Sequence, residues 1–245
     1  MTGVLGSRVP VSIADQLKRA VAERAAEHIQ PGMRVGLGTG STVAHFLDVL
    51  GELIGRGELA ELVGVPTSVL TAERARSLGI RLMELDEAQP LDVTVDGADE
   101  VDPGLDLVKG LGGALLREKM VAQASHRLVV MVDESKMVRR LGMRAPLPVE
   151  VIPFGWRAHL PFLRELGCEP ALRRGADGSS YLTDNGNHML DCRFPDGMDD
   201  PGAIDEVLRR RAGVVESGLF LRMATTVIVA AASGIRILER GGAEA

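Results

Sequence analysis

The stretch Met33–Leu50 reads MRVGLGTGSTVAHFLDVL and combines an apolar segment, a glycine-rich loop and an apolar helical pattern. Met33–Leu37 predicts a short buried strand, Gly36–Thr42 the loop that follows it, and Val43–Leu50 the next helix. Glycines permit positive φ and close backbone approach, and a helix N-terminus favours an anion. A dinucleotide fingerprint would need glycine at Ser41, and no P-loop lysine follows. The loop alone favours phosphate binding and a tight structural turn about equally.

The same alternation of strands and helices continues on both sides of this stretch. Ser12 followed by Asp15 indicates the start of a helix, which ends near Gln30. Further strand-length runs lie at Leu62–Pro66, Arg81–Leu85, Leu91–Val95 and Leu128–Val132, and further helices are predicted over Thr71–Leu78 and Ala114–Ser125. Strands that alternate with helices predict an α/β fold, here a Rossmann-like parallel sheet with helices on both faces.

The pattern changes from Pro146 to Arg222, where prolines are closely spaced. Two strand-like runs and two helical runs alternate there, at Val149–Ile152, Trp156–Leu166, His188–Cys192 and Ile204–Arg211. This mixture predicts a smaller α+β domain over residues 146–222. The aliphatic run Thr226–Ala232 predicts a buried strand that returns to the first sheet. Residues 1–145 and 223–245 would then form the Rossmann-like domain, with the smaller domain inserted before the C-terminal strand.

Composition narrows the possible functions. The 245 residues include 28 Lys and Arg, 34 Asp and Glu, one Trp, one Tyr and five Phe, with a net charge of −6. This balance disfavours nucleic-acid binding, and no apolar run is long enough to span a membrane. The N-terminal residues lack the apolar segment of a secretory signal. Cys168 and Cys192 are too few for a disulfide framework, so we expect reduced thiols in a cytoplasmic protein.

An acidic segment follows one of the predicted strands. Val93–Asp102 reads VTVDGADEVD, with carboxylates at Asp96, Asp99, Glu100 and Asp102. Ligands of α/β folds bind at the carboxyl ends of strands, where a carboxylate can polarise a sugar hydroxyl or take up a proton. The alternatives are a solvated turn shaped by Asp and Gly, and a Mg²⁺ or Ca²⁺ site. We rank the metal site last because the spacing does not match an EF-hand loop.

A second glycine-rich turn lies within Leu107–Met120, LVKGLGGALLREKM. Lys109 precedes three glycines, Gly110, Gly112 and Gly113, and a predicted helix. Such a turn can direct several backbone N–H groups at one oxyanion.

Glu118 lies about one turn into that helix. Helical spacing places it among the apolar side chains of Leu115, Val121 and Ala122. Apolar surroundings would raise the pKa of this carboxyl towards the working pH, which suits a general base. The commoner alternative is an exposed Glu118 paired with Arg117 or Lys119. Lys136, in VDESK, either reaches a phosphate or is an ordinary surface lysine.

Taken together, these motifs resemble the type A family of ribose-5-phosphate isomerases. The resemblance covers nearly the whole chain, and the order and spacing of its motifs are highly specific. The motifs are GLGTGST at Gly36, PTSVLT at Pro66, DGADE at Asp96, KGLGGALLREK at Lys109, DESK at Asp133, PLPVEVIPFGW at Pro146, TDNGNHMLD at Thr183 and GVVESGLF at Gly213. TDNGN alone is compatible with a hairpin turn, and we assign it no chemistry.

The resemblance implies an aldose–ketose isomerase that interconverts D-ribose 5-phosphate and D-ribulose 5-phosphate in the non-oxidative pentose phosphate pathway. It implies a cytoplasmic homodimer or higher homo-oligomer that needs no cofactor or metal, and it places the catalytic base at Glu118. The substrate-binding residues it implies are Lys18, Thr39, Gly40, Ser41, Thr42, Asp96, Gly97, Ala98, Asp99, Lys109, Gly110, Leu111, Gly112 and Lys136. Leu111 departs from the commonest pattern, which has glycine, and Leu116 replaces a common threonine.

The chemistry of such a reaction fits these residues. A proton must move between adjacent carbons, and one carboxylate above a cis-enediolate can perform both transfers; Glu118 is the candidate. Lys109 and the turn Gly110–Gly113 could stabilise the oxyanion, and either Asp96 or Asp99 could assist ring opening. The phosphate would be held by Ser41, Thr42, Lys18 and Lys136. Two alternatives are a sugar-phosphate-sensing module and a coenzyme A transferase-like enzyme on a related fold.

Overall fold

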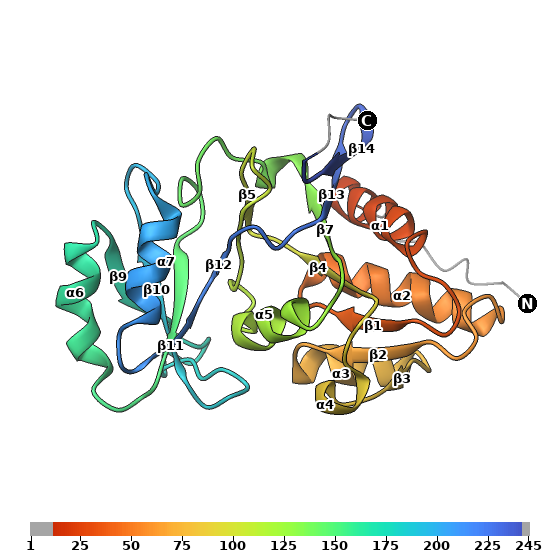
Figure 1. Cartoon of the computed structure of the whole chain (residues 1–245), viewed down its shortest axis with the longest axis horizontal. Coiled ribbons are helices and arrows are strands. Elements are labelled where there is room, and N and C mark those ends of the chain that lie inside the picture. Colours follow the sequence, from red (N-terminus) through yellow and green to blue (C-terminus); the bar gives the residue numbers. More distant parts are fainter. Residues whose placement is uncertain (1–11, 242–245) are drawn as a thin grey trace, which may run out of the picture.

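A seven-stranded sheet forms the larger part of the computed structural model, which describes residues 12–241 (Figure 1). Its strands, in spatial order, are β14 (Gly234–Glu239), β13 (Thr226–Ala231), β7 (Leu128–Asp133), β4 (Val93–Gly97), β1 (Arg34–Leu37), β2 (Val63–Pro66) and β3 (Arg81–Leu82). All neighbours are parallel except β13 and β14. The predicted parallel sheet is therefore confirmed, and the chain returns to it through β13.

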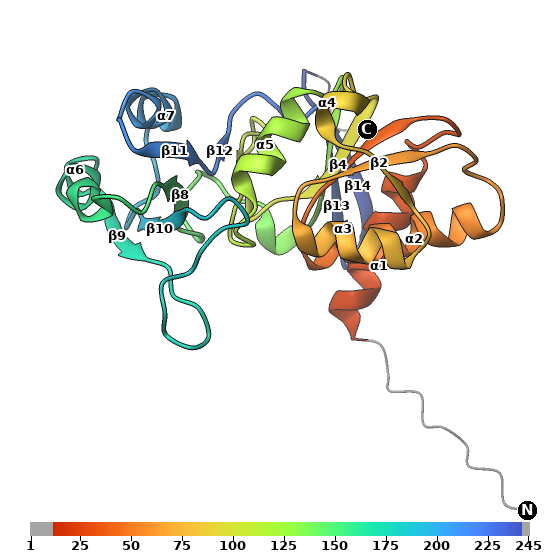
Figure 2. The ribbon, with the colours of Figure 1, turned by 90° about the horizontal axis from the view of Figure 1, so that it is seen from below.

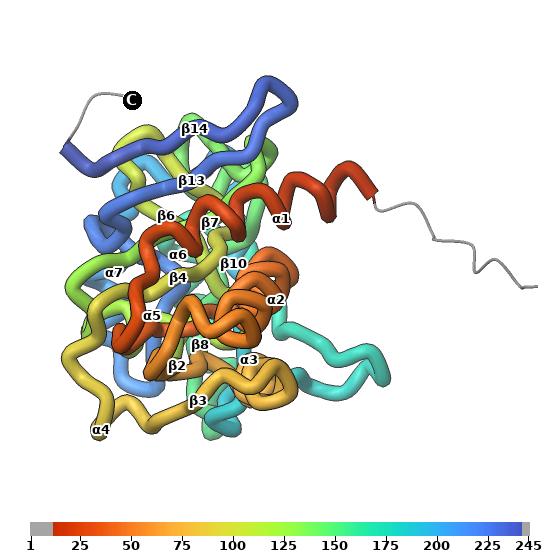
Figure 3. Tube along the Cα trace, turned by 90° about the vertical axis from the view of Figure 1, so that its right-hand side faces the viewer, coloured from red at the N-terminus to blue at the C-terminus, as the bar shows by residue number. Residues whose placement is uncertain are grey.

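Helices cover both faces of this sheet. Figure 2 shows α1 (Ile13–Ala26), α2 (Ser41–Gly55) and α3 (Val69–Ser77) on one side, and α4 (Leu85–Ala88) and α5 (Leu115–Gln123) on the other. Figure 3 shows α1 lying along β13 and β7. Successive residues of β7 serve opposite cores: Met131 packs with α1 and α2, whereas Val130 packs on the face of α5. Burial on both faces explains why these strands are apolar throughout.

A separate antiparallel sheet lies at the other end of the molecule (Figure 1). Its strands, in spatial order, are β11 (Val214–Ser217), β8 (Leu147–Val151), β10 (His188–Arg193) and β9 (Glu169–Leu172), and it carries α6 (His159–Glu165) and α7 (Pro201–Arg209). Its own apolar core includes Val149, Leu163 and Leu190. We propose residues 146–222 as a smaller domain on this basis.

A three-stranded sheet joins these two parts. It consists of β5 (Glu100–Val101), β6 (Leu107–Val108) and β12 (Leu219–Phe220). The pairing of β12 with β6 brings the chain that leaves the smaller sheet back against the segment that ends at Lys109. The backbone N–H of Lys109 donates to the carbonyl of Gly218, at 2.9 Å.

Several elements differ from those expected. The helix predicted over Trp156–Leu166 is divided into a 3₁₀ turn, η2 (Trp156–Ala158), and α6, while Arg81–Leu85 contributes only the two residues of β3 before α4 begins. β9 and β14 were not expected from the apolar pattern because both are partly exposed edge strands. An edge strand also tolerates Pro170, since its missing N–H breaks no internal ladder.

Within residues 12–241, no helix is both long and apolar enough to cross a membrane. The expectation that the N-terminus lacks a secretory signal falls mainly on residues 1–11, outside the described part of the chain.

Candidate active site

The predicted site residues gather at the carboxyl ends of β1 and β4. The chain runs from β1 to β2 and β3 on one side and later returns to β4 on the other, so this is the switch point where α/β sheets bind ligands. A cavity of about 130 Å³ opens here. It is lined by Thr39, Gly40, Ser41, Thr42, Gly97, Ala98, Asp99, Lys109, Gly110, Gly112, Glu118 and Lys136.

Asp96, the fourth residue of β4, lies beneath this cavity and is only 1% exposed. Its Oδ1 accepts hydrogen bonds from the backbone N–H of Thr39, at 3.1 Å, and from that of Gly97, at 2.7 Å. Gly38 permits this arrangement, because a Cβ there would lie 2.1 Å from Asp96 Oδ1. The carboxylate therefore fastens the loop after β1 to the end of β4.

Lys109 connects Asp96 to Glu118. Its Nζ lies 3.0 Å from Asp96 Oδ2 and 3.5 Å from Glu118 Oε2, and it donates to the carbonyl of Gly97 at 2.6 Å. Neither Lys109 nor Glu118 is more than 3% exposed. The ammonium also lies over the ring of Phe220, 5.4 Å from its centroid. Two carboxyl groups thus share one buried cation.

The two carboxyl groups are not equivalent. Asp96 is closer to Lys109 and accepts two backbone hydrogen bonds, whereas Glu118 Oε2 accepts none from the described residues. Burial, reinforced by the charge of Asp96 and opposed by Lys109, raises the pKa of Glu118 to about 8. Burial alone would lower the pKa of Lys109, but the charges of Asp96 and Glu118 outweigh it and raise that pKa. The site therefore holds a fixed cation beside a carboxyl that can exchange a proton near neutral pH.

The opposite side of the cavity is suited to an anion. Gly40 precedes α2 with a φ of +123°, and no described side chain caps that helix. The first residues of α2, Ser41 and Thr42, line the cavity, so their hydroxyls and uncapped N–H groups accompany the positive end of the helix dipole. Lys136, at the end of η1 (Glu134–Lys136), lines the cavity as well.

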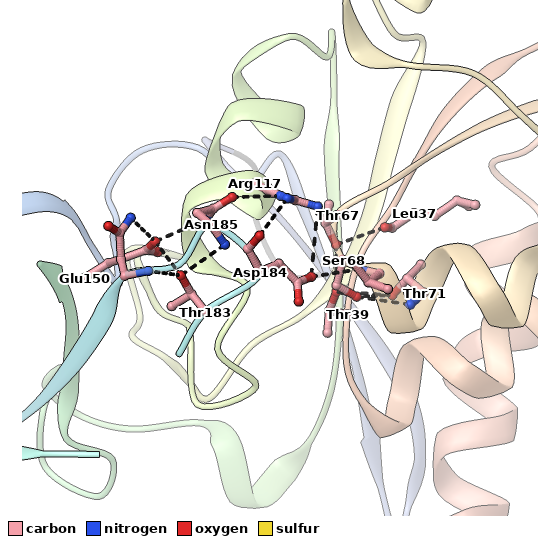
Figure 4. Close-up of polar contacts among 12 residues, drawn as sticks. Leu37, Thr39, Thr67, Ser68, Thr71, Arg117, Glu150, Thr183, Asp184 and Asn185 are labelled. Atoms are coloured by element: carbon pink, nitrogen blue, oxygen red, sulfur yellow. Dashed lines mark hydrogen bonds and ion pairs between the residues drawn. The ribbon is translucent and has the colours of Figure 1, made fainter. Parts of the chain in front are cut away.

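A hydroxyl cluster that we did not predict supports Thr39 (Figure 4). The Thr39 hydroxyl lies 2.8 Å from that of Thr67 and 3.2 Å from that of Thr71, and it donates to Ser68 Oγ at 2.9 Å. Thr71 Oγ1 in turn donates to the carbonyl of Gly38, at 2.8 Å. The available signal was PTSVLT, a polar run directly after the strand that neighbours β1.

Three predicted substrate-binding residues are absent from the cavity lining: Asp96, which lies beneath it, Lys18 and Leu111. Lys18 is half-buried on α1 and is absent from the lining among the described residues. Leu111 is 42% exposed, and its backbone N–H donates to Asp99 Oδ2 at 2.9 Å. Positive φ occurs at Gly110 (+108°) and Gly113 (+83°) instead, so a leucine is accommodated at position 111.

The acidic segment after β4 does not converge on one point. Both Glu100 carboxylate oxygens accept backbone N–H groups, those of Gly142, Arg144 and Ala145. Asp102 accepts the N–H of Asp106 and so closes a turn. No three His, Cys, Asp or Glu side chains within residues 12–241 are grouped as a metal site would require.

The two basic neighbours of Glu118 point away from it. Arg117 donates to Asn185 and to the carbonyl of Asp184, and Lys119 donates to Glu216. The interpretation of Glu118 as an exposed residue paired with Arg117 or Lys119 is therefore wrong. The burial expected from its apolar helical neighbours is what the structure shows.

Comparison with known proteins identifies consistent relatives. The family model for ribose 5-phosphate isomerase A (phosphoriboisomerase A) matches residues 63–234. The chain is 51% identical over 232 residues to a ribose-5-phosphate isomerase A of Rhodopseudomonas palustris (strain TIE-1), covering 92% of this chain and 98% of the relative. It is 50% identical over 231 residues to a probable ribose-5-phosphate isomerase 2 of Arabidopsis thaliana, covering 92% and 87%. A solved D-ribose-5-phosphate isomerase in complex with phospho-erythronic acid superimposes with a TM-score of 0.90 at 41% identity, covering 92% and 99%.

Proposed function

The chain belongs to the ribose 5-phosphate isomerase A family of enzymes, and from this premise we propose that it interconverts D-ribose 5-phosphate and D-ribulose 5-phosphate through an enediolate, with Glu118 as the base. The observation that carries this proposal is the buried Glu118 carboxyl, whose pKa of about 8 lies near neutrality, beside the Lys109 ammonium in one cavity. The proposed place in the pentose phosphate pathway follows from the family.

Glu118 performs both carbon proton transfers in this proposal. Its carboxylate removes the proton from C2 of the open-chain aldose, and the electron pair forms the enediolate. The resulting carboxylic acid then returns a proton to C1, while the hydroxyl proton moves from O2 to O1. No atom is gained or lost, so the residues need only hold and move protons.

Lys109 stabilises the negative charge that develops on the oxygens at C1 and C2. Its ammonium is already fixed by Asp96 and by the carbonyl of Gly97, so little reorganisation accompanies the reaction. Gly110 and Gly112 line the same cavity, and in this proposal the backbone N–H groups of their turn supplement the cation.

The phosphate is bound at the other end of the cavity. Ser41 and Thr42 supply hydroxyls at the start of α2, and Lys136 supplies a positive charge. We retain Lys18 as a proposed phosphate ligand, although its side chain would have to approach from α1. Binding energy from this remote dianion holds C1 and C2 near Glu118 and helps to lower the barrier.

Ring opening is assigned to Asp99 in this proposal. Asp99 lines the cavity, whereas Asp96 is 1% exposed and already bonded to Lys109 and two backbone N–H groups. Asp96 therefore acts by fixing Lys109 rather than by meeting the sugar. Asp99 is held in place by the N–H of Leu111.

The family assignment and the site favour an enzyme over the sensing module considered from the sequence. A sugar-phosphate sensor has no use for a buried carboxyl beside a buried cation, whose burial costs stability. Membership of this family likewise displaces the coenzyme A transferase-like alternative. The homodimer or higher homo-oligomer expected from the resemblance stays a prediction that analytical ultracentrifugation would test.

Isotope exchange tests the proposed reaction. D-Ribose 5-phosphate incubated with the enzyme in D₂O should yield D-ribulose 5-phosphate that carries deuterium at C1, because an exchangeable carboxyl group delivers that proton. Proton NMR of the product measures the incorporation. Failure to form any ketose would reject the activity, whereas ketose formed with complete internal transfer and no deuterium would reject a solvent-exchanging base.

A further inference from the structure

The loop Thr183–Asn187, with the sequence TDNGN, connects the smaller sheet to the proposed active site. It precedes β10, and the Thr183 hydroxyl accepts the backbone N–H groups of Asn185 and Asn187, each at 3.2 Å. The N–H of Gly186, which has a φ of +77°, closes the turn on the Thr183 carbonyl. The loop is thus a defined hairpin, but its internal bonds do not explain its polar side chains.

A buried carboxylate fixes the base of this loop. Glu150, the fourth of the five residues of β8, is fully buried. Its Oε1 accepts hydrogen bonds from the Thr183 hydroxyl at 2.9 Å, from Asn185 Nδ2 at 3.1 Å and from Asn187 Nδ2 at 2.9 Å (Figure 4). Three residues of the loop are therefore held by one rigid strand of the smaller sheet.

The tip of the loop contacts two helices of the larger part of the molecule, α5 and α3 (Figure 4). On α5, Arg117 Nε donates to Asn185 Oδ1 at 2.9 Å, and its Nη2 donates to the Asp184 carbonyl at 3.1 Å. On α3, the N–H of Val69 donates to Asp184 Oδ2 at 2.8 Å. One short loop thus contacts the helix that carries Glu118 and the helix whose N-terminal residues support Thr39.

The neighbours of these contacts are the groups that do the proposed chemistry. Arg117 directly precedes Glu118, and Val69 directly follows Ser68, which accepts the hydroxyl of Thr39. On the far side of Glu118, Lys119 donates to Glu216 at 2.7 Å and to the carbonyl of Ser217 at 2.8 Å. The residues directly before and after Glu118 on the short helix α5 therefore both contact the smaller domain.

We propose that the Thr183–Asn187 loop holds α5 so that the Glu118 carboxylate stays aligned with C1 and C2 of the substrate, and that Arg117 is the positioning residue through which it acts. This inference rests on the proposed isomerase function. Release of Arg117 leaves the phosphate ligands at Ser41 and Lys136 in place, because those residues belong to other segments. The expected loss is therefore in turnover rather than in substrate binding.

The test compares two arginine variants of the full chain. Arg117→Met keeps the length of the side chain but removes its hydrogen bonds to the loop. Arg140→Met is the matched control, since Arg140 is 41% exposed, against 39% for Arg117, and pairs with Asp199 away from the cavity. Small misplacements of reacting groups cost up to about 10²-fold in rate, so we expect Arg117→Met to lower kcat by about tenfold or more. KM should stay within about twofold, and Arg140→Met should match the wild type.

A double-mutant cycle shows whether Arg117 acts through the loop. Asn185→Ala should also lower kcat. The kcat of the double variant, Arg117→Met with Asn185→Ala, should be no more than about twofold below that of the less active single variant, because both substitutions break the same contact. If Arg117→Met fails to fold by circular dichroism, Arg117→Lys serves the same comparison, since lysine cannot reproduce the two-pronged contact.

The outcomes separate this inference from the proposed function. A wild type that forms no ketose would reject the function and the positioning role together. An active wild type with an Arg117→Met kcat within twofold of normal would overturn the positioning role alone. Losses that multiply in the double variant, or a rise in KM with kcat unchanged, would overturn it as well.

Discussion

Replacement of Glu118 by glutamine removes the proposed base while keeping its size. Positioned proton transfer contributes about 10²- to 10⁴-fold to rate, so we expect kcat to fall by at least about 10². Substrate affinity should change far less, because the proposed phosphate site lies apart from Glu118, at the start of α2 and at Lys136. A coupled assay of D-ribulose 5-phosphate formation measures both constants. A folded Glu118→Gln variant with turnover near that of the wild type would remove Glu118 from the mechanism and turn attention to Asp99, the other carboxylate that lines the cavity.

The same substitution has a defined effect on pH dependence. In the wild type, kcat/KM should rise with pH until the Glu118 carboxyl, whose pKa is about 8, is ionised, because the base acts unprotonated. This rise of kcat/KM with pH should be absent in Glu118→Gln. A residual activity that keeps the wild-type pH profile would refute the assignment, since the titrating group would then lie elsewhere.

The free energy of unfolding should fall as the pH rises, whereas kcat/KM should rise. The pKa of Glu118 is raised on folding from 4.5 to about 8, so the folded protein binds a proton that the unfolded chain has lost between these values. The contribution of Glu118 to the free energy of unfolding is therefore fully present below pH 4.5 and lost as pH rises through about 8. Urea unfolding at several pH values in this range measures the free energy of unfolding. As the pH rises, this free energy should fall less for Glu118→Gln than for the wild type. An equal decline in both proteins would show that folding does not raise the pKa of the Glu118 carboxyl.

Three further outcomes are expected. Lys136→Ala should raise KM by about 10- to 10²-fold and weaken inhibition by inorganic phosphate with kcat nearly unchanged, since a charge-assisted bond is worth about 1.5–3 kcal/mol; a fall in kcat alone would contradict its role in binding. Gly38→Ala should destabilise the protein by about 1–3 kcal/mol in thermal unfolding and impair activity, because the new Cβ would lie 2.1 Å from Asp96 Oδ1; normal stability and activity would refute the close approach. Activity should persist after exhaustive dialysis against EDTA, and a loss reversed only by a divalent cation would restore the metal interpretation of the Asp96–Asp102 segment.

The sequence predicted the part of the fold that depends on local pattern. Runs such as Leu128–Val132 are apolar at every position because the strand is covered on both faces, and that signal survives without any knowledge of neighbours. The edge strands β9 and β14 carry mixed, partly exposed residues, so their pairing depends on strands distant in the chain. Their absence from the prediction follows from this physical difference.

The sequence predicted which residues form the candidate site but not the role of each one. The strand-end rule indicated the segments of Thr42 and Asp99, which follow β1 and β4, whereas Lys109 was singled out by the glycine-rich turn that follows it. The burial of Asp96 beneath the cavity, and the bond from Arg117 to Asn185 across 68 positions, arise from tertiary packing. Helical spacing allowed Glu118 to be either a buried base or an exposed residue, because the sequence pattern of a helix does not show which segments pack against it.

The antiparallel pairing of β12 with β6 also bears on how the protein unfolds. The chain that leaves the smaller sheet runs directly beside Lys109, whose N–H donates to the Gly218 carbonyl, and a Cβ on Gly218 would lie 2.2 Å from the Lys109 carbonyl oxygen. Local opening of the smaller sheet would pull on this strand and so on the backbone of the lysine. The two parts should therefore unfold as one cooperative unit, and amide hydrogen exchange at Lys109 should report the global stability rather than a local fluctuation.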